Sequence, residues 1–150
     1  ETYSDCLTGL WHATDSVWQN QTEIFGYEDS GYVVATPDVG VNMGDTTHGP
    51  RLGYNLSFST IGTYNVWIRM SVPDGSGDSI HVGLNGDPTS YGGAGVTTSP
   101  HHEWNWEWAS INVNSTGGHQ LHIWMREDGV RIDSVILSND ENFIPNEDGG

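Results

Sequence analysis

The stretch HQLHIWMREDGVRIDSVILS, residues 119–138, decides the fold class. In its first part Leu121, Ile123 and Met125 alternate with other residues, the period of two that is typical of a β-strand with one buried face. The sequence EDG at 127–129 indicates a turn, since glycine readily takes a positive φ. Residues 130–137 are apolar enough to form a second strand inside a sheet. We therefore expect a β-hairpin over residues 119–138.

Charged side chains occupy unusual places in this expected hairpin. Asp133 falls in the middle of the second strand, where an ionised carboxylate is costly unless it is paired or bound to a metal. Glu127 and Asp128 lie in the turn, and Arg131 follows closely. We expect Glu127, Asp128 and Arg131 to lie together at one end of the sheet.

The rest of the chain also reads as short strands separated by turns. Apolar residues alternate over residues 51–58, 63–72 and 79–85, with Gly, Pro, Asp and Asn between these runs and no convincing helical period. This pattern predicts an all-β sandwich of two antiparallel sheets. The tryptophans at 104, 106 and 108 have the opposite parity to Ile111 and Val113, so we expect a β-bulge near residues 109–110.

Composition limits the possible partners. The 150 residues suffice for one domain, and a single cysteine excludes an intrachain disulfide. Twenty acidic residues against four basic ones give a net charge of −16, which disfavours nucleic acid and membrane surfaces and suggests a marine or halophilic source. The chain lacks an initial Met, and we interpret it as a piece of a longer protein, with a module at 1–142 and a tail or linker at 143–150.

Five segments resemble a known family when they are taken in order: GPRLGYNLSF, GTYNVWIRMSVPDGSGDSIHVGLNG, WNW, GGHQLHIWMREDGVRIDSVILS and the closing ND. Over residues 31–140 the chain resembles carbohydrate-binding modules of families 6 and 35. The resemblance implies a jelly-roll β-sandwich of the galactose-binding-like type. It also implies a secreted, monomeric, non-catalytic module that is covalently linked to a polysaccharide-degrading catalytic domain.

The resemblance also implies two sites. One is a structural Ca²⁺ site, in which Asp133 matches a carboxylate of the last core strand and Glu1 is a remnant of an N-terminal acidic motif. The other is a sugar site at the loop end of the sandwich, where Trp104 or Trp106 matches one aromatic residue. Arg131 stands where many relatives have Asn. The second aromatic residue should come from residues 36–50, which contain no Trp or Tyr.

The candidate ligand contacts combine an aromatic platform with polar loop residues. An indole face can stack on the apolar C–H face of a pyranose. Trp104, Trp106 and Trp108 lie on one face of an extended strand, so we expect a platform there with Trp104 or Trp106 as the stacking ring, unless two of the three fill the core. The expected hydrogen-bonding residues are Glu127, Asp128, Arg131, Asn42, Tyr91 and His102. Trp67 and Trp124, each two residues before an Arg, could form a second site if their strands are neighbours. We favour coverage of these two rings by the N-terminal segment.

We predict a non-catalytic carbohydrate-binding module for a neutral marine polymer such as agarose. Glu127 and Asp128 could be an acid–base pair for glycoside hydrolysis, but adjacent residues on one turn rarely flank a bond. His101 and His102 lack an evident third metal ligand. The alternatives are an interaction module that packs against a neighbouring domain and a small polysaccharide lyase or hydrolase.

Overall fold

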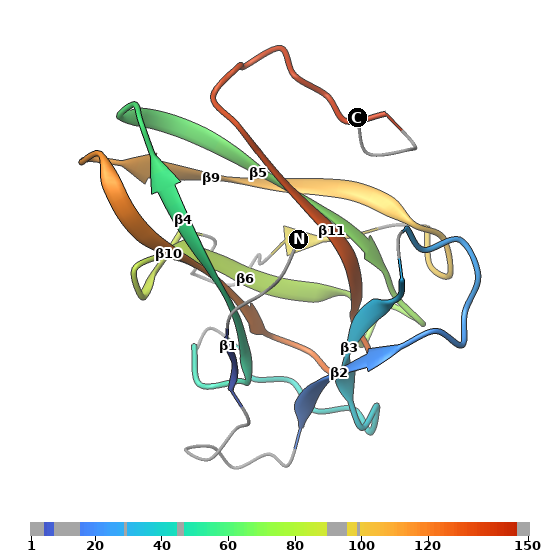
Figure 1. The fold of residues 1–150 in the computed structure, drawn as a ribbon. Coiled ribbons are helices and arrows are strands. Elements are labelled where there is room, and N and C mark those ends of the chain that lie inside the picture. The colour runs from blue at the N-terminus through green and yellow to red at the C-terminus, as the bar shows by residue number, and fades with distance from the viewer. Residues whose placement is uncertain are drawn as a thin grey trace.

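The protein folds as two antiparallel β-sheets packed face to face, as the computed structural model shows (Figure 1). The structure describes residues 5–7, 16–28, 30–44, 47–89, 96–98 and 100–146. Within these ranges there is no helix, and therefore none long and apolar enough to cross a membrane. The all-β sandwich predicted from alternation is confirmed.

The first sheet is built around three long strands. Their order is β4 (Arg51–Phe58), β10 (Gly117–Met125) and β6 (Ser79–Leu84). The short strand β1 (Asp5–Leu7) pairs with β4, while β7 (Asp87–Pro88) and β8 (Val96–Thr97) both pair with β6. The second sheet runs in the order β2 (Val17–Gln21), β3 (Tyr32–Thr36), β11 (Arg131–Ser138), β5 (Gly62–Ser71) and β9 (Asn105–Val113).

The core lies between the sheets and consists of the alternating residues expected from the sequence. Leu121 and Ile123 of β10 meet Ile68 of β5 and Ile111 of β9 in one cluster, and all four are fully buried. The first sheet departs from the simple pattern, because Trp124 on the opposite face of β10 is also only 3% exposed. Both faces of this central strand are therefore covered.

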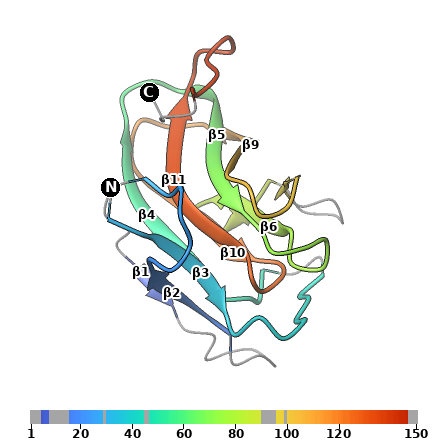
Figure 2. The same ribbon diagram turned by 90° about the vertical axis from the view of Figure 1, so that its right-hand side faces the viewer.

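The predicted hairpin over residues 119–138 is wrong, because β10 and β11 belong to different sheets. Residues 126–130, here called the crossover, carry the chain from one sheet to the other (Figure 2). The backbone N–H of Glu127 donates to Ser79 O at 3.2 Å, and that of Gly129 donates to Ala35 O at 2.8 Å. Because these groups bond to neighbouring segments and not across a hairpin, the crossover is fixed between the two sheets.

The predicted bulge in β9 is also wrong. Pairing with β5 runs without a register shift from Val113 to Asn105. The tryptophans therefore face outward simply because their parity is opposite to that of the core residues Ile111 and Val113. A bulge does occur in β11, where the register shifts between Ile132 and Ser134. Bulges re-aim side chains, and this one falls at Asp133.

The proposed joint site of Trp67 and Trp124 is excluded by topology. Trp67 lies on β5 in the second sheet and Trp124 on β10 in the first, so their strands are not neighbours. Both rings are buried, at 9% and 3% exposure.

Two segments cover the outer face of the second sheet. Residues 22–28 reach it where Arg69 donates to Gly26 O at 3.0 Å, and residues 139–146 reach it where Trp106 donates to Asn146 O at 3.0 Å. In Figure 1 the red C-terminal segment passes above β5 and β9. Pro145 is buried, so the tail expected from residue 143 packs on the sandwich as far as the structure describes it.

Candidate functional site

The outward residues of β9 form a row of tryptophans on the second sheet. Trp104 and Trp106 are half-buried, whereas Trp108 is 52% exposed. Trp108 lies opposite Trp67 of β5, and their ring centroids are 6.0 Å apart with the planes tilted by 44°. Trp108 is therefore the most accessible ring of the row.

The other two indoles are held in place by the covering segments. Trp104 donates its Nε1–H to Phe25 O at 3.1 Å, and Trp106 donates to Asn146 O at 3.0 Å. Trp104 also meets Tyr32 edge-on at 5.7 Å between centroids, and the Arg69 guanidinium carbon lies 5.4 Å from its ring centroid. These contacts orient both rings and leave less of each for a ligand.

Neutral polar side chains continue the same face beyond Trp108. Ser110 of β9 donates to Asn65 Oδ1 of β5 at 3.1 Å, and Thr63 donates to Asn112 Oδ1 at the same distance. Ser110, Asn112 and Thr63 are exposed. We call this surface the aromatic–amide strip; its members are Trp106, Trp108, Ser110, Asn112, Thr63, Asn65 and Trp67. It offers an aromatic face beside uncharged hydrogen-bonding groups, which suits a ligand with both C–H faces and hydroxyl groups.

Glu127 and Asp128 do not face solvent, which corrects their assignment as ligand contacts. Glu127 is 5% exposed and accepts hydrogen bonds from Asn42 Nδ2 at 2.5 Å and Ser79 Oγ at 2.6 Å. Asp128 is fully buried and accepts from Val39 N at 2.8 Å. Through these hydrogen bonds both carboxylates attach neighbouring loops to the crossover. The side-chain amide of Asn42 is hydrogen-bonded to Glu127 and is therefore already occupied.

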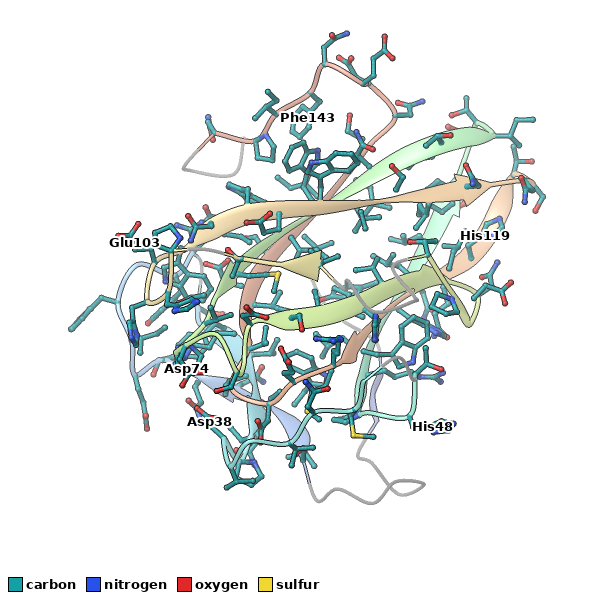
Figure 3. The ribbon with its side chains drawn as sticks, turned by 180° about the vertical axis from the view of Figure 1, so that it is seen from behind. Asp38, His48, Asp74, Glu103, His119 and Phe143 are labelled. Carbon is teal, nitrogen blue, oxygen red and sulfur yellow. The ribbon has the colours of Figure 1, made fainter. Side chains whose placement is uncertain are left out.

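The loop end itself is lined by acidic groups. Burial, and then the charges of Asp128 and Asp74, raise the pKa of Asp38, while Arg131 lowers it. Figure 3 shows Asp38, Asp74 and Glu103 gathered at one end of the sandwich, with His119 at the other. Half-buried Arg131 thus lies close to one of these carboxylates, that of Asp38.

His102 and Tyr91 are the two remaining residues that were predicted to contact the ligand. His102 is exposed, and its φ of 65° places it in the left-handed region. Its backbone N–H donates to Val72 O at 2.8 Å, which anchors the loop before β9. Tyr91 lies outside the described residues.

The surroundings of Asp133 do not fit a Ca²⁺ ion. Its side chain has no exposed area, and its Oδ2 accepts from Arg69 Nη1 at 2.5 Å and from Glu28 N at 2.9 Å. A guanidinium therefore stands where a cation would bind. The described residues contain no group of three or more His, Cys, Asp or Glu able to hold a metal, and Glu1 lies outside them. Burial raises the pKa of Asp133, outweighing the N–H of Glu28 and the charge of Arg69, which lower it.

Two exposed aromatic residues were not among the predicted ligand contacts. The parity of Trp104, Trp106 and Trp108 placed all three on one face of the strand, but Trp108 was not assigned as a ligand contact. Phe25 is 96% exposed on residues 22–28, where no periodicity indicated a role.

The two packed antiparallel sheets define the class of the protein, a β-sandwich domain with a row of tryptophans on one outer face. Residues 12–143 match the family model of the glycosyl hydrolase family 115 C-terminal domain, and the chain belongs to this family. An uncharacterized protein, P23 of Formosa agariphila, is 25% identical over 146 residues, covering 81% of the chain. The chain spans 35% of the length of that protein.

Solved structures show the same fold. A family 35 carbohydrate-binding module from Paenibacillus barcinonensis has a TM-score of 0.61 at 21% identity, over 85% of this chain and 91% of that one. A family 35 module from Clostridium thermocellum has a TM-score of 0.61 at 17% identity, over 82% and 91%. The expected jelly roll of the family 35 type is confirmed.

Proposed function

We propose that this domain is a non-catalytic carbohydrate-binding module that holds an attached polysaccharide-degrading enzyme close to its polymer. The observation that carries the proposal is the aromatic–amide strip, with Trp108 half-exposed at its centre and neutral amides and hydroxyls next to it. Membership of a glycoside hydrolase C-terminal domain family supports an accessory role beside a catalytic domain.

The mechanism begins with a sugar ring on Trp108. The apolar C–H face of a pyranose stacks on the exposed indole, and its hydroxyls bond to Ser110 and Asn65 along the strip. Trp106 extends the platform at one side, while Trp104 mainly orients the covering segment 22–28. Arg131 and His102 belong to the separate loop-end surface.

The charge of the chain indicates the class of polymer. With 20 acidic and 4 basic residues the surface repels polyanions, so a secreted module for a neutral polymer, such as agarose from a marine source, fits best. Stacking of one or two rings in an open surface gives a Kd on the order of 10–100 μM, about −5.5 to −7 kcal/mol. Such weak binding still raises the effective concentration of a linked enzyme.

Affinity electrophoresis tests the proposal. Native gels containing agarose, β-glucan, xylan or alginate are run with the wild type, Trp108→Ala and the matched control Val39→Ala. Val39 is 70% exposed but lies at the loop end, where its N–H bonds to Asp128. We expect one neutral polymer to retard the wild type and Val39→Ala, and Trp108→Ala to run freely.

Other results would redirect the assignment. Retardation lost with Val39→Ala and kept with Trp108→Ala would move the sugar site to the loop end. No retardation by any polymer would instead favour an interaction module that packs against a neighbouring domain.

A further inference from the structure

A buried charged group on the second sheet takes no part in the proposed sugar contacts. We call it the Arg69 cluster; its members are Arg69, Asp133, Glu28 and Ser134. The side chains of Arg69, Asp133 and Glu28 are 12%, 0% and 25% exposed. Arg69 Nη1 lies 2.5 Å from Asp133 Oδ2, and its Nε lies 3.7 Å from Glu28 Oε1.

Three elements meet in this cluster. The bulge of β11 brings Asp133 and Ser134 to it, and β5 supplies Arg69 from the position opposite Ser134. Segment 22–28 closes over them, with Glu28 N bonded to Asp133 and Gly26 O bonded to Arg69. Ser134 Oγ donates to Glu28 Oε2 at 2.9 Å.

Segment 22–28 also fits tightly against Trp104. Gly26 has a φ of +90°, and a Cβ built there would lie 3.0 Å from Trp104 Cδ1. Since the Arg69 guanidinium is near the same ring, the cluster fixes both the segment and the indole.

The charges explain why Arg69 is needed. Two carboxylates of low exposure meet, and Arg69 is the one cation that the described residues bring to them. Asp133 Oδ1 and Glu28 Oε1 are buried and have no hydrogen-bond partner. A positive charge next to these two oxygens would therefore stabilise the carboxylates further. Without the guanidinium, two carboxylates, a serine hydroxyl and the Gly26 carbonyl would remain, and this is an oxygen set of the kind that suits Ca²⁺.

We propose that Arg69 is a built-in cation that takes the place of a bound Ca²⁺ at Asp133. Arg69 is thus a positioning residue: it joins β5, β11 and segment 22–28 and orients Trp104 without a metal. The inference concerns the architecture of the outer face and stands whether or not the strip binds sugar.

Removal of Arg69 should create a metal site, which tests the proposal directly. Thermal unfolding of the wild type, Arg69→Ser, Arg69→Lys and Arg69→Ser/Asp133→Asn is followed with Ca²⁺ and with chelator. We expect Arg69→Ser to be less stable in chelator and to gain about 5 °C in Tm at saturating Ca²⁺. The double variant should lose this gain, and Arg69→Lys, which keeps the charge, should not acquire it.

Terbium luminescence gives a second readout at the same site. Tb³⁺ bound at Asp133 would be sensitised by Trp104, because the indole is adjacent to the guanidinium that the ion replaces. We expect emission from Arg69→Ser that disappears in the double variant, and no such Asp133-dependent emission from the wild type.

Two outcomes would overturn the proposal. One is wild-type emission that Asp133→Asn abolishes, because the metal would then bind beside Arg69. The other is an Arg69→Ser variant that folds but gains neither stability nor emission. If Arg69→Ser fails to fold, the terbium emission of the wild type is compared with that of Asp133→Asn. Stronger emission from the wild type would show a metal bound beside Arg69 and overturn the proposal, whereas equal emission would support it.

Discussion

The crossover between the sheets and the outer face of β9 distribute polar and aromatic residues in opposite ways. In the crossover Glu127 and Asp128 are 5% and 0% exposed. On β9, Trp108 is 52% exposed. A reading based on hydropathy alone would place the carboxylates in solvent and the indole inside.

The difference follows from what surrounds each region. The crossover runs between loops whose backbone and side-chain donors must be satisfied, and the two carboxylates accept from Val39 N, Asp78 N and Ser79 Oγ. The strand β9 is an edge strand with only one face on the core. The other face of β9 is open to solvent at Trp108, and an exposed aromatic ring there marks a surface for binding another molecule.

Loss of Glu127 should give the largest effect on stability. Glu127→Ala leaves Asn42, Ser79 and Arg126 without their shared acceptor, so we expect a loss of about 3–5 kcal/mol in the free energy of unfolding. Urea denaturation measures it. The matched control Glu141→Ala, at an exposed position, should change the value by less than about 0.5 kcal/mol.

The same variant, Glu127→Ala, also gives a prediction for polymer binding. Folded Glu127→Ala protein should bind the polymer as the wild type does, because its carboxylate is buried. Weaker binding with unchanged stability would return Glu127 to the ligand site and undo the contrast between the two regions.

A comparison within the tryptophan row should separate anchoring from binding. Trp104→Ala removes contacts with Phe25 O, Tyr32 and Arg69, so we expect a loss of about 2 kcal/mol in stability. Trp108→Ala should cost under about 1 kcal/mol in stability and weaken binding about tenfold, or about 1.4 kcal/mol. Denaturation and titration with the retained polymer measure both quantities.

The opposite pattern would be as informative. If Trp108→Ala proves the more destabilising change, its exposed ring serves the fold, and the aromatic–amide strip loses its central contact.

The sequence was sufficient for the longer strands and for the faces that they turn to the core. Alternation is a local property, so Leu121 and Ile123 could be assigned to the core from their neighbours alone. The outward tryptophans of β9 were visible in the same way, although an unneeded bulge was invoked to explain their parity. Asp133 was recognised as a carboxylate that requires a partner.

Features that depend on distant segments could not be read from the sequence. Two strands and a turn look alike whether they form a hairpin or cross between sheets, and the crossover is fixed by loops 36–50 and 73–79. The partner of Asp133 is Arg69, 64 residues away, and the family resemblance suggested a metal in its place. Phe25 is placed by segment 22–28, which carries no periodic pattern.

The smallest predicted effect concerns the acidic groups beside the crossover. Asp38 lies against it, since a Cβ on Gly129 would be 2.9 Å from Asp38 Cγ. Burial and the charges of Asp128 and Asp74 raise the pKa of Asp38 above its ordinary value of 3.8. A raised pKa means that the folded protein holds the proton more tightly, so this contribution is full below pH 3.8 and is lost as the pH rises through the folded value.

Asp38→Asn should therefore become more stable relative to the wild type as the pH rises, by roughly 0.5 kcal/mol or less because the group is largely exposed. Asp74→Asn is the matched contrast. Hydrogen bonds from Ser76 lower the pKa of Asp74, so its contribution is present above pH 3.8 and lost as the pH falls. Urea denaturation from below pH 3.8 up to neutral pH should give slopes of opposite sign for the two variants, with the Asp74 slope below pH 3.8 and the Asp38 slope above it. If the stabilities of the two variants change with pH in the same direction, the buried carboxylates of the crossover do not act on Asp38. The crossover and the outer face of β9 would then differ in the burial of their side chains but not in electrostatics.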